Sequence, residues 1–159
     1  MKIFRASSEH APVLSAIAWK AKASWGYPAD WLEEWRDQLT MTPEFIAANP
    51  TFAARIDERI VGFHALLQSK DKLRLEHLWI LPEWMGQGIG RRLFAHAAEQ
   101  AIMHGAPCLT IEADPHAEAF YLHLGALRIG LTTSEIKGRS RELPLLEFRL
   151  QPTSSAAAR

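Results

Sequence analysis

Three glycines at alternate positions stand where an apolar run of the chain gives way to an amphipathic segment. They are Gly86, Gly88 and Gly90, and Arg91 and Arg92 follow them directly. Glycine lets the backbone bend sharply and lets its N–H groups approach a ligand closely. The first N–H groups of a helix have no partner within the helix, and the helix dipole attracts anions to that end. Two arginines and no acidic residue at such a start therefore predict a bound phosphate group, the alternative being a glycine-rich turn without a ligand.

The spacing of these glycines excludes two other phosphate-binding motifs. A dinucleotide-binding loop has the pattern G-x-G-x-x-G, but Arg91 occupies the place of its third glycine. A P-loop has the pattern G-x-x-x-x-G-K-[ST], which occurs nowhere in the chain. The sequence therefore indicates a phosphate cradle of another type.

A second motif lies downstream, at residues 114–126. Asp114 suits a helix N-cap, Pro115 the first helical position and Gly125 a left-handed helix end. Four apolar residues between them recur at helical spacing and predict a helix with one packed face. These residues are Ala117, Phe120, Tyr121 and Leu124.

Together the two motifs resemble those of the GNAT superfamily of N-acetyltransferases. The first is similar to the family's acyl-CoA loop, Arg/Gln-x-x-Gly-x-Gly/Ala, and the second to its pattern N-x-x-A-x-x-F-Y-x-x-x-G-F. The resemblance covers about residues 2–150 and is strongest over residues 76–126. Met85 stands where the family usually has Arg or Gln, and Asp114, His116 and Ala126 also depart from the pattern.

The resemblance implies acetyl-CoA as the acyl donor. In the family the loop amides bind the pyrophosphate of CoA, and backbone groups of the preceding strand pair with the pantetheine arm. The cofactor-binding positions implied in this chain are Leu78, Trp79, Ile80, Gly86, Gln87, Gly88, Ile89, Gly90, Arg91 and Asp114.

The resemblance also implies direct transfer of an acetyl group to an amine, without a covalent enzyme intermediate. Such a transfer needs a deprotonated amine, a polarised thioester and a proton for the departing thiolate. Tyr121 matches the family tyrosine, and a neutral phenol can donate that proton. The alternative for Tyr121 is a core aromatic whose hydroxyl is satisfied elsewhere.

Glu76 is the expected base, acting directly or through a water. His77 competes with it because histidine is the side chain that titrates closest to neutral pH, and Glu112 is a third candidate. Successive residues of an ideal strand point to opposite faces, so at most one of Glu76 and His77 should face the site unless a bulge resets the alternation. A solvated or ion-paired role for Glu76 stays open.

Composition limits the other possibilities. A chain of 159 residues can bury one substantial core, and its 18 basic and 18 acidic residues give no net charge that would recruit nucleic acid or an anionic membrane. The single cysteine, Cys108, excludes an internal disulfide and fits a reducing compartment. No apolar run reaches the length of a membrane span, and the histidines lack metal-ligand spacing. We expect a cytoplasmic enzyme without a metal.

The hydrophobic pattern predicts one α+β domain at residues 1–150 and a flexible tail at residues 151–159. The resemblance implies a mixed, mostly antiparallel sheet of about six to seven strands flanked by helices, splayed between the motif strand and the next one. Strands are expected at 2–5, 51–56, 59–67, 73–81, 108–113, 127–131 and 145–150, with a polar connection at 132–144. Helices are expected from Ser7 or Ser8, over 30–39, from 43, over 88–104 and around Tyr121.

The acceptor is the least defined part of the prediction. Four tryptophans and a tyrosine crowd the N-terminal helices, where they form either one wall of the acceptor site or ordinary core. These residues are Trp19, Trp25, Tyr27, Trp31 and Trp35. The connection at 132–144 often closes over the acceptor or joins a homodimer in the family. The acceptor classes are a small-molecule or peptide amine, or else a protein N-terminus or lysine, and a catalytically silent acyl-CoA-binding sensor is the alternative outside enzymes.

Overall fold

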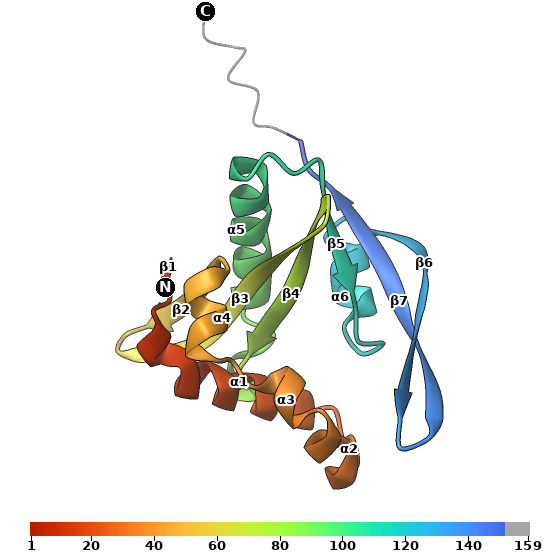
Figure 1. Cartoon of the computed structure of the whole chain (residues 1–159). Helices are drawn as coiled ribbons and strands as arrows, with labels where there is room; N and C mark the ends of the chain where they lie inside the picture. Colours follow the sequence, from red (N-terminus) through yellow and green to blue (C-terminus); the bar gives the residue numbers. More distant parts are fainter. Residues whose placement is uncertain (152–159) are drawn as a thin grey trace, which may run out of the picture.

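A seven-stranded sheet forms the middle of the molecule, in the order β1-β2-β3-β4-β5-β7-β6 (Figure 1). The computed structural model describes residues 1–151. Neighbouring strands are antiparallel except for β4 and β5, which are parallel. The strands are β1 (Lys2–Arg5), β2 (Thr51–Ile56), β3 (Arg59–Ser69), β4 (Lys72–Ile80), β5 (Cys108–Glu112), β6 (Leu127–Ile136) and β7 (Arg139–Arg149). The predicted α+β class and mixed, mostly antiparallel sheet are confirmed.

Helices cover both faces of the sheet (Figure 1). Phe63 and Ala65 of β3 pack into the core beneath the N-terminal helices, whereas His64 between them lies against His96 of the long helix on the other face. This alternation is what a strand buried on both faces requires. The N-terminal helices are α1 (Ala11–Ala23), α2 (Ala29–Glu34), α3 (Arg36–Leu39) and α4 (Pro43–Ala48), and the opposite face carries α5 (Ile89–Met103) and α6 (Glu118–His123).

Strands β4 and β5 splay apart after a short paired stretch, as expected. Leu73 and Arg74 pair with Leu109 and Thr110, and no further pairs join the two strands within the described residues. Figure 1 shows the two strands diverging toward the N-terminal helices. Backbone groups on this edge of β4 therefore lack a strand partner beyond Arg74 and are available to another extended group.

A bulge lies in β4 at Glu76. The register between β3 and β4 shifts there by one residue, so Glu76 has no residue opposite it. Leu75 packs with the α5 core before the bulge and Leu78 does so after it, which resets the alternation. The ideal-strand expectation that Glu76 and His77 point to opposite faces is therefore wrong: both lie on the face of the N-terminal helices, where His77 contacts Phe45.

The predicted polar connection at 132–144 is instead a long β hairpin. Strands β6 and β7 pair as far as Ile136 and Arg139, and only Lys137 and Gly138 lie between them. Both turn residues have positive φ, 50° and 75°, as a tight two-residue hairpin turn requires. The sequence did not predict this pairing, because charged and hydroxyl side chains on both strands resemble those of a polar loop.

Two predicted helices differ in their bounds. The helix expected over 30–39 breaks at Trp35, whose φ and ψ of −89° and 1° end α2 and begin α3. The helix expected from Asp114 begins only at Glu118, because Asp114 caps a turn by accepting the His116 N–H at 2.8 Å.

Two further expectations concern the ends of the chain and membranes. The tail predicted at 151–159 lies outside the described residues apart from Gln151. Among helices of the described part, none has the length and apolar character needed to cross a bilayer.

Candidate active site

Two cavities lie near the glycine loop and the splayed strands. The larger one opens beside the loop and has a volume of about 330 Å³. It lies among the C-terminal end of β4, the loop that follows, α1 and α6. Its lining is mostly apolar and aromatic, as is usual for pockets that hold organic ligands. The lining residues are Ala21, Trp25, Leu78, Trp79, Ile80, Trp84, Met85, Gly86, Gly88, Gly90, Arg91, His116, Ala117, Phe120 and Tyr121.

The three glycines serve two different purposes. Gly86 and Gly88 have φ values of 77° and 82°, in the left-handed region where an L side chain is strained. Gly90 is helical, and a Cβ there would lie 3.2 Å from the Phe120 ring. Gly86 and Gly88 thus curve the loop, whereas Gly90 lets α5 approach α6 closely.

The loop presents free hydrogen-bond donors. Within residues 1–151, the backbone N–H groups of Gly86, Gln87 and Gly88 have no recorded acceptor, and the first N–H groups of α5 have no partner inside the helix. Arg91 and Arg92 are exposed, form no ion pair within the described residues, and have no acidic neighbour in the first turn. The helix dipole and both arginines therefore create an uncompensated positive field at the cavity mouth.

Seven of the ten predicted cofactor-binding residues line this cavity, and three do not. The Gln87 side chain turns back to the Glu83 carbonyl, with 3.4 Å between Nε2 and the oxygen. The Ile89 side chain is buried in the core with Leu93. The Asp114 carboxylate belongs to a polar network on the far side of the cavity wall.

Tyr121 lies in the wall of the larger cavity. Its ring packs against Phe94 and Phe120, with centroid distances of 5.8 and 5.1 Å. Burial raises the pKa of the Tyr121 phenol, so the hydroxyl keeps its proton at neutral pH. The hydroxyl has no hydrogen-bond partner among the described residues.

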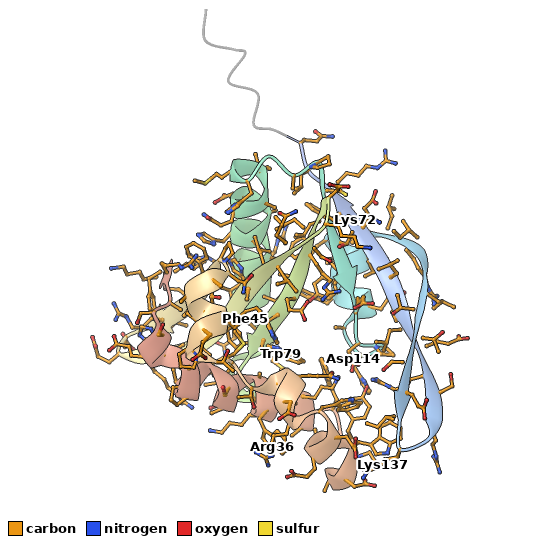
Figure 2. The ribbon with its side chains drawn as sticks, in the orientation of Figure 1. Arg36, Phe45, Lys72, Trp79, Asp114 and Lys137 are labelled. Atoms are coloured by element: carbon orange, nitrogen blue, oxygen red, sulfur yellow. The ribbon has the colours of Figure 1, made fainter. Side chains whose placement is uncertain are left out.

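A second cavity of about 190 Å³ lies on the other side of Trp79. The Trp79 side chain lines both cavities, and Figure 2 shows it facing Asp114 across the gap between β4 and β5. The smaller cavity is lined by charged and polar groups. Its residues are Lys22, Trp35, Gln38, Arg74, Leu75, Glu76, Trp79, Glu112, Asp114, Ser134, Arg141 and Leu143.

Glu76 faces the smaller cavity, not the larger one. Arg74 Nε lies 2.7 Å from Glu76 Oε2, and Arg74 Nη1 lies 3.4 Å from Glu112 Oε2. One guanidinium thus links both predicted carboxylates, and all three side chains are partly exposed.

His77 is poorly suited to the role of base. The Trp79 indole donates a hydrogen bond to His77 Nδ1 at 3.0 Å. Burial, with a smaller contribution from the Arg74 charge, lowers the pKa of His77 to about 4. His77 is therefore neutral at pH 7, has one nitrogen occupied, and lines neither cavity.

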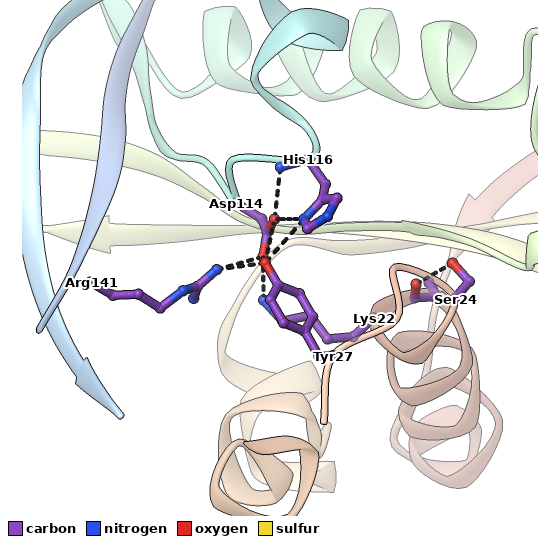
Figure 3. A network of polar contacts seen from close by, with 7 residues as sticks. Lys22, Ser24, Tyr27, Asp114, His116 and Arg141 are labelled. Carbon is purple, nitrogen blue, oxygen red and sulfur yellow. Dashed lines mark hydrogen bonds and ion pairs between the residues drawn. The ribbon is translucent and has the colours of Figure 1, made fainter. Parts of the chain in front are cut away.

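A polar network around Asp114 separates the two cavities (Figure 3). The carboxylate accepts hydrogen bonds from Lys22 at 2.6 Å, from the Tyr27 hydroxyl at 2.8 Å and from Arg141 at 3.3 Å. His116 Nδ1 lies 2.9 Å from the other carboxylate oxygen. Sequence reasoning missed these partners, because the network joins positions up to 114 residues apart and leaves no local spacing to detect.

The aromatic residues of the N-terminal helices and of the connection between α1 and α2 contribute both to the cavity walls and to the core. Trp25 lines the larger cavity and Trp35 the smaller one. Tyr27, Trp31 and Trp35 also pack on one another, and Lys22 lies 4.2 Å from the Trp35 ring centroid. A buried cation against aromatic faces helps to fix the wall between the cavities.

Comparison with solved structures finds the same fold in several acetyltransferases. A GCN5-related N-acetyltransferase from Rhodopseudomonas palustris superposes with a TM-score of 0.81 at 21% identity, covering 94% of this chain and 95% of that one. The PaiA N-acetyltransferase from Thermoplasma acidophilum, solved with coenzyme A, gives 0.71 at 18% identity, covering 93% and 98%. A ribosomal-protein-alanine N-acetyltransferase from Brucella melitensis gives 0.71 at 22% identity, covering 94% and 100%.

Sequence comparison assigns the family. No curated protein sequence matches the chain. A family model described as an acetyltransferase (GNAT) domain matches residues 24–135. That range includes the glycine loop, Tyr121 and the residues of β4 that line the two cavities. Because that match covers well over half of the chain, the protein belongs to the GNAT family of acetyltransferases.

Proposed function

We propose that this protein moves an acetyl group directly from acetyl-CoA to a primary amine of a small molecule or peptide. One observation carries the proposal: backbone N–H groups without a partner in residues 1–151 stand at the mouth of a cavity of about 330 Å³, which reaches Tyr121 along the part of β4 that has no strand pair in those residues. The fold neighbour from Thermoplasma acidophilum was solved with coenzyme A, which supports the same ligand class here.

The proposed binding mode divides the cofactor between loop and strand. The diphosphate lies on the amides of residues 86–91 with Arg91 beside it, because an anion fits the dipole end of α5. The pantetheine arm pairs with backbone groups of Leu78, Trp79 and Ile80, which line the cavity. Met85 stands where the family usually has Arg or Gln, so one polar side chain is absent, but these backbone donors stay in place.

Tyr121 is the proposed acid. Its buried, protonated hydroxyl faces the larger cavity without another partner among the described residues. When the C–S bond breaks, the phenol gives its proton to the CoA thiolate. Protonating the leaving group in place lowers the barrier for its departure.

Glu76 is the proposed base for the incoming amine. It lines the smaller cavity next to Trp79, the side chain that borders both cavities. An ammonium entering there gives a proton to Glu76 directly or through a water, and Glu76 then releases that proton to solvent. Glu112 shares Arg74 at the longer distance of 3.4 Å and is the weaker alternative.

The smaller cavity is the proposed acceptor site. A volume of about 190 Å³ accommodates an amino group and a short side chain, not a folded protein surface. The neighbour from Brucella melitensis is named for acetylating a ribosomal-protein alanine, so a protein N-terminus threaded into this cavity is the second candidate. A cytoplasmic location is part of the proposal.

A homodimer formed through β6 also belongs to the proposal. This strand is one of the two edge strands of the sheet and carries exposed Leu127, Ile129 and Leu131, with 58%, 50% and 49% of their surfaces accessible. An edge strand can pair with its own copy about a two-fold axis. Light scattering of the wild type and of a variant with Leu127, Ile129 and Leu131 all replaced by Ser tests this. We expect a dimeric wild type and a monomeric variant, and a monomeric wild type would refute the proposal.

A thiol-release assay tests the enzymatic proposal. Acetyl-CoA is mixed with polyamines, aminoglycosides, amino acids and short peptides, and free CoA thiol is measured. We expect at least one amine class to release CoA in stoichiometric balance with acetylated product. Binding of acetyl-CoA without release by any amine would instead favour the silent sensor.

A further inference from the structure

His116 occupies a position in the larger cavity that the proposed mechanism has not used. Its ring stacks on Trp25, with centroids 5.3 Å apart and planes 8° from parallel. The side chain is 44% exposed, and it lines the larger cavity together with Trp79 and Tyr121. It therefore borders the space in which the thioester would react.

The partners of His116 determine which ring nitrogen carries hydrogen. Nδ1 lies 2.9 Å from Asp114 Oδ1 and 3.1 Å from the Tyr27 hydroxyl oxygen. The Tyr27 hydroxyl donates its own hydrogen to Asp114 and accepts from Arg141 at 2.6 Å. Because an ionised carboxylate only accepts hydrogen bonds, Nδ1 is the donor in the neutral ring.

Asp114 is held in its ionised form by the cations around it. Burial alone would raise its pKa, but the charge and hydrogen bond of Lys22, with the His116 N–H and the Tyr27 hydroxyl, hold the pKa of Asp114 below its ordinary value. Arg141 Nη2 adds a second positive charge at 3.3 Å. Two groups therefore face His116 directly, Asp114 and Tyr27. Two more act on it through Asp114, namely Lys22 and Arg141.

The free nitrogen is Nε2. It has no recorded partner in the part of the chain that the structure describes, and it lies on the side of the ring away from Asp114. A histidine whose Nδ1–H is fixed by a carboxylate presents Nε2 as a proton acceptor, and the resulting imidazolium is stabilised by that carboxylate.

We propose that His116 is a catalytic proton acceptor in the acetyl transfer and that Asp114 is its positioning residue. This inference rests on the proposed function. An ammonium substrate must lose two protons to become an amide, and Glu76 accounts for the first. His116 Nε2 takes the second from the nitrogen once the C–N bond to the thioester carbon has formed.

The proton balance closes with the residues already named. The C–S bond breaks, and the thiolate receives the Tyr121 proton. The imidazolium then returns a proton to the Tyr121 phenolate through solvent, and Glu76 releases its proton to solvent. The products are one amide, one CoA thiol and one free proton, because one of the two protons lost by the ammonium ends on the thiol and the other in solvent.

The test uses two substitutions of His116 in the full chain. His116→Asn keeps an N–H that can reach Asp114 but removes Nε2, and His116→Ala opens a space for added imidazole. We expect kcat to fall roughly 30-fold or more in both, while acetyl-CoA binding by calorimetry stays within about twofold. Imidazole should restore part of the turnover of His116→Ala only, which a loss of folding would not allow.

His123→Asn is the matched control, since His123 is an exposed histidine of α6 that lines neither cavity. It should turn over like wild type. In addition, the acidic limb of the kcat–pH profile should flatten or shift in His116→Asn.

Two results would overturn the inference while the proposed function stands. One is an active wild type with His116→Asn turnover within twofold of it. The other is an unchanged kcat with a tenfold weaker acetyl-CoA affinity, which would make His116 a cofactor contact. If wild type releases no thiol with any amine, the proposed function fails, and the role of His116 fails with it.

Discussion

Trp79 and His77 are joined by a hydrogen bond from the indole N–H to His77 Nδ1, with 3.0 Å between the nitrogens. The bond fixes the one side chain that borders both cavities. His77 and Trp79 are alternate residues of β4 and so share one face of the strand, and the bulge turns the Glu76 side chain to the same face. The bulge thereby places the predicted base.

Replacing His77 with Gln should reduce stability more than it alters the pH profile. The His77 pKa of about 4 makes it neutral throughout the working range, so the acidic limb of kcat between pH 5 and 8 should remain. Losing the bond to Trp79 should lower the free energy of unfolding by about 1–3 kcal/mol. Urea unfolding and a pH–rate profile measure both effects, and disappearance of the acidic limb would make His77 the base.

Replacing Tyr121 with Phe should remove the acid and little else. The ring contacts with Phe94 and Phe120 are retained, so acetyl-CoA affinity should stay within about twofold. We expect kcat to fall roughly 100-fold, the usual contribution of a general acid. Steady-state kinetics on a proven substrate provide the measurement, and unchanged turnover would return Tyr121 to the role of a core aromatic.

Gly88→Ala and Gly105→Ala form a matched pair. Both glycines have positive φ, 82° and 74°, and an added Cβ would meet no atom within 4 Å at either. Each substitution should therefore cost about 1 kcal/mol of stability. Only Gly88→Ala should weaken binding of acetyl-CoA, by roughly tenfold, because it changes the direction of the loop N–H groups.

Calorimetry separates the two variants. Equal acetyl-CoA affinities for Gly88→Ala, Gly105→Ala and wild type would show that the curvature of the loop is unrelated to the ligand.

Acid should destabilise the fold through His64. This side chain is fully buried on β3, with Nε2 2.9 Å from His96 Nδ1, and burial lowers its pKa to about 3 with help from His96. In the unfolded chain His64 binds a proton near pH 6.5, whereas in the folded chain it does so only near pH 3. Stability is thus fully present above pH 6.5 and is lost as the pH falls through this interval, by about 2 kcal/mol between pH 7.5 and 5.

Urea titrations of wild type and His64→Phe at these two pH values check the prediction. The variant should lose markedly less stability on acidification, although it forfeits the bond to His96. An equal loss in both proteins would place the acid sensitivity elsewhere.

The sequence was informative where function depends on local spacing. The glycine loop, the start of α5 and the apolar face of α6 are set by residues within one or two turns of each other, so motif and period predicted them. The splay of β4 from β5 followed from the family resemblance and is confirmed by their two residue pairs. Local rules failed at Asp114, which fits a helix cap by type but serves a turn and a buried network instead.

The parts that sequence did not predict depend on distant partners. The bulge at Glu76 arises from pairing with β3, and the extent of the β6–β7 hairpin depends on a turn at Lys137 that lacks the usual Asn-Gly or Asp-Gly signal. The contact of Lys22 with Asp114 joins residues 92 positions apart. Such contacts emerge only when the chain is folded.

The central claim is that main-chain amides at residues 86–91 hold the diphosphate of coenzyme A. Calorimetric titration with CoA and, separately, with pantetheine, which lacks the diphosphate, tests it most directly. The structure predicts measurable binding of CoA that is at least roughly 100-fold tighter than that of pantetheine, since the charged contacts lie on the loop. No uptake of CoA at millimolar concentration, or equal affinity for the two compounds, would contradict it.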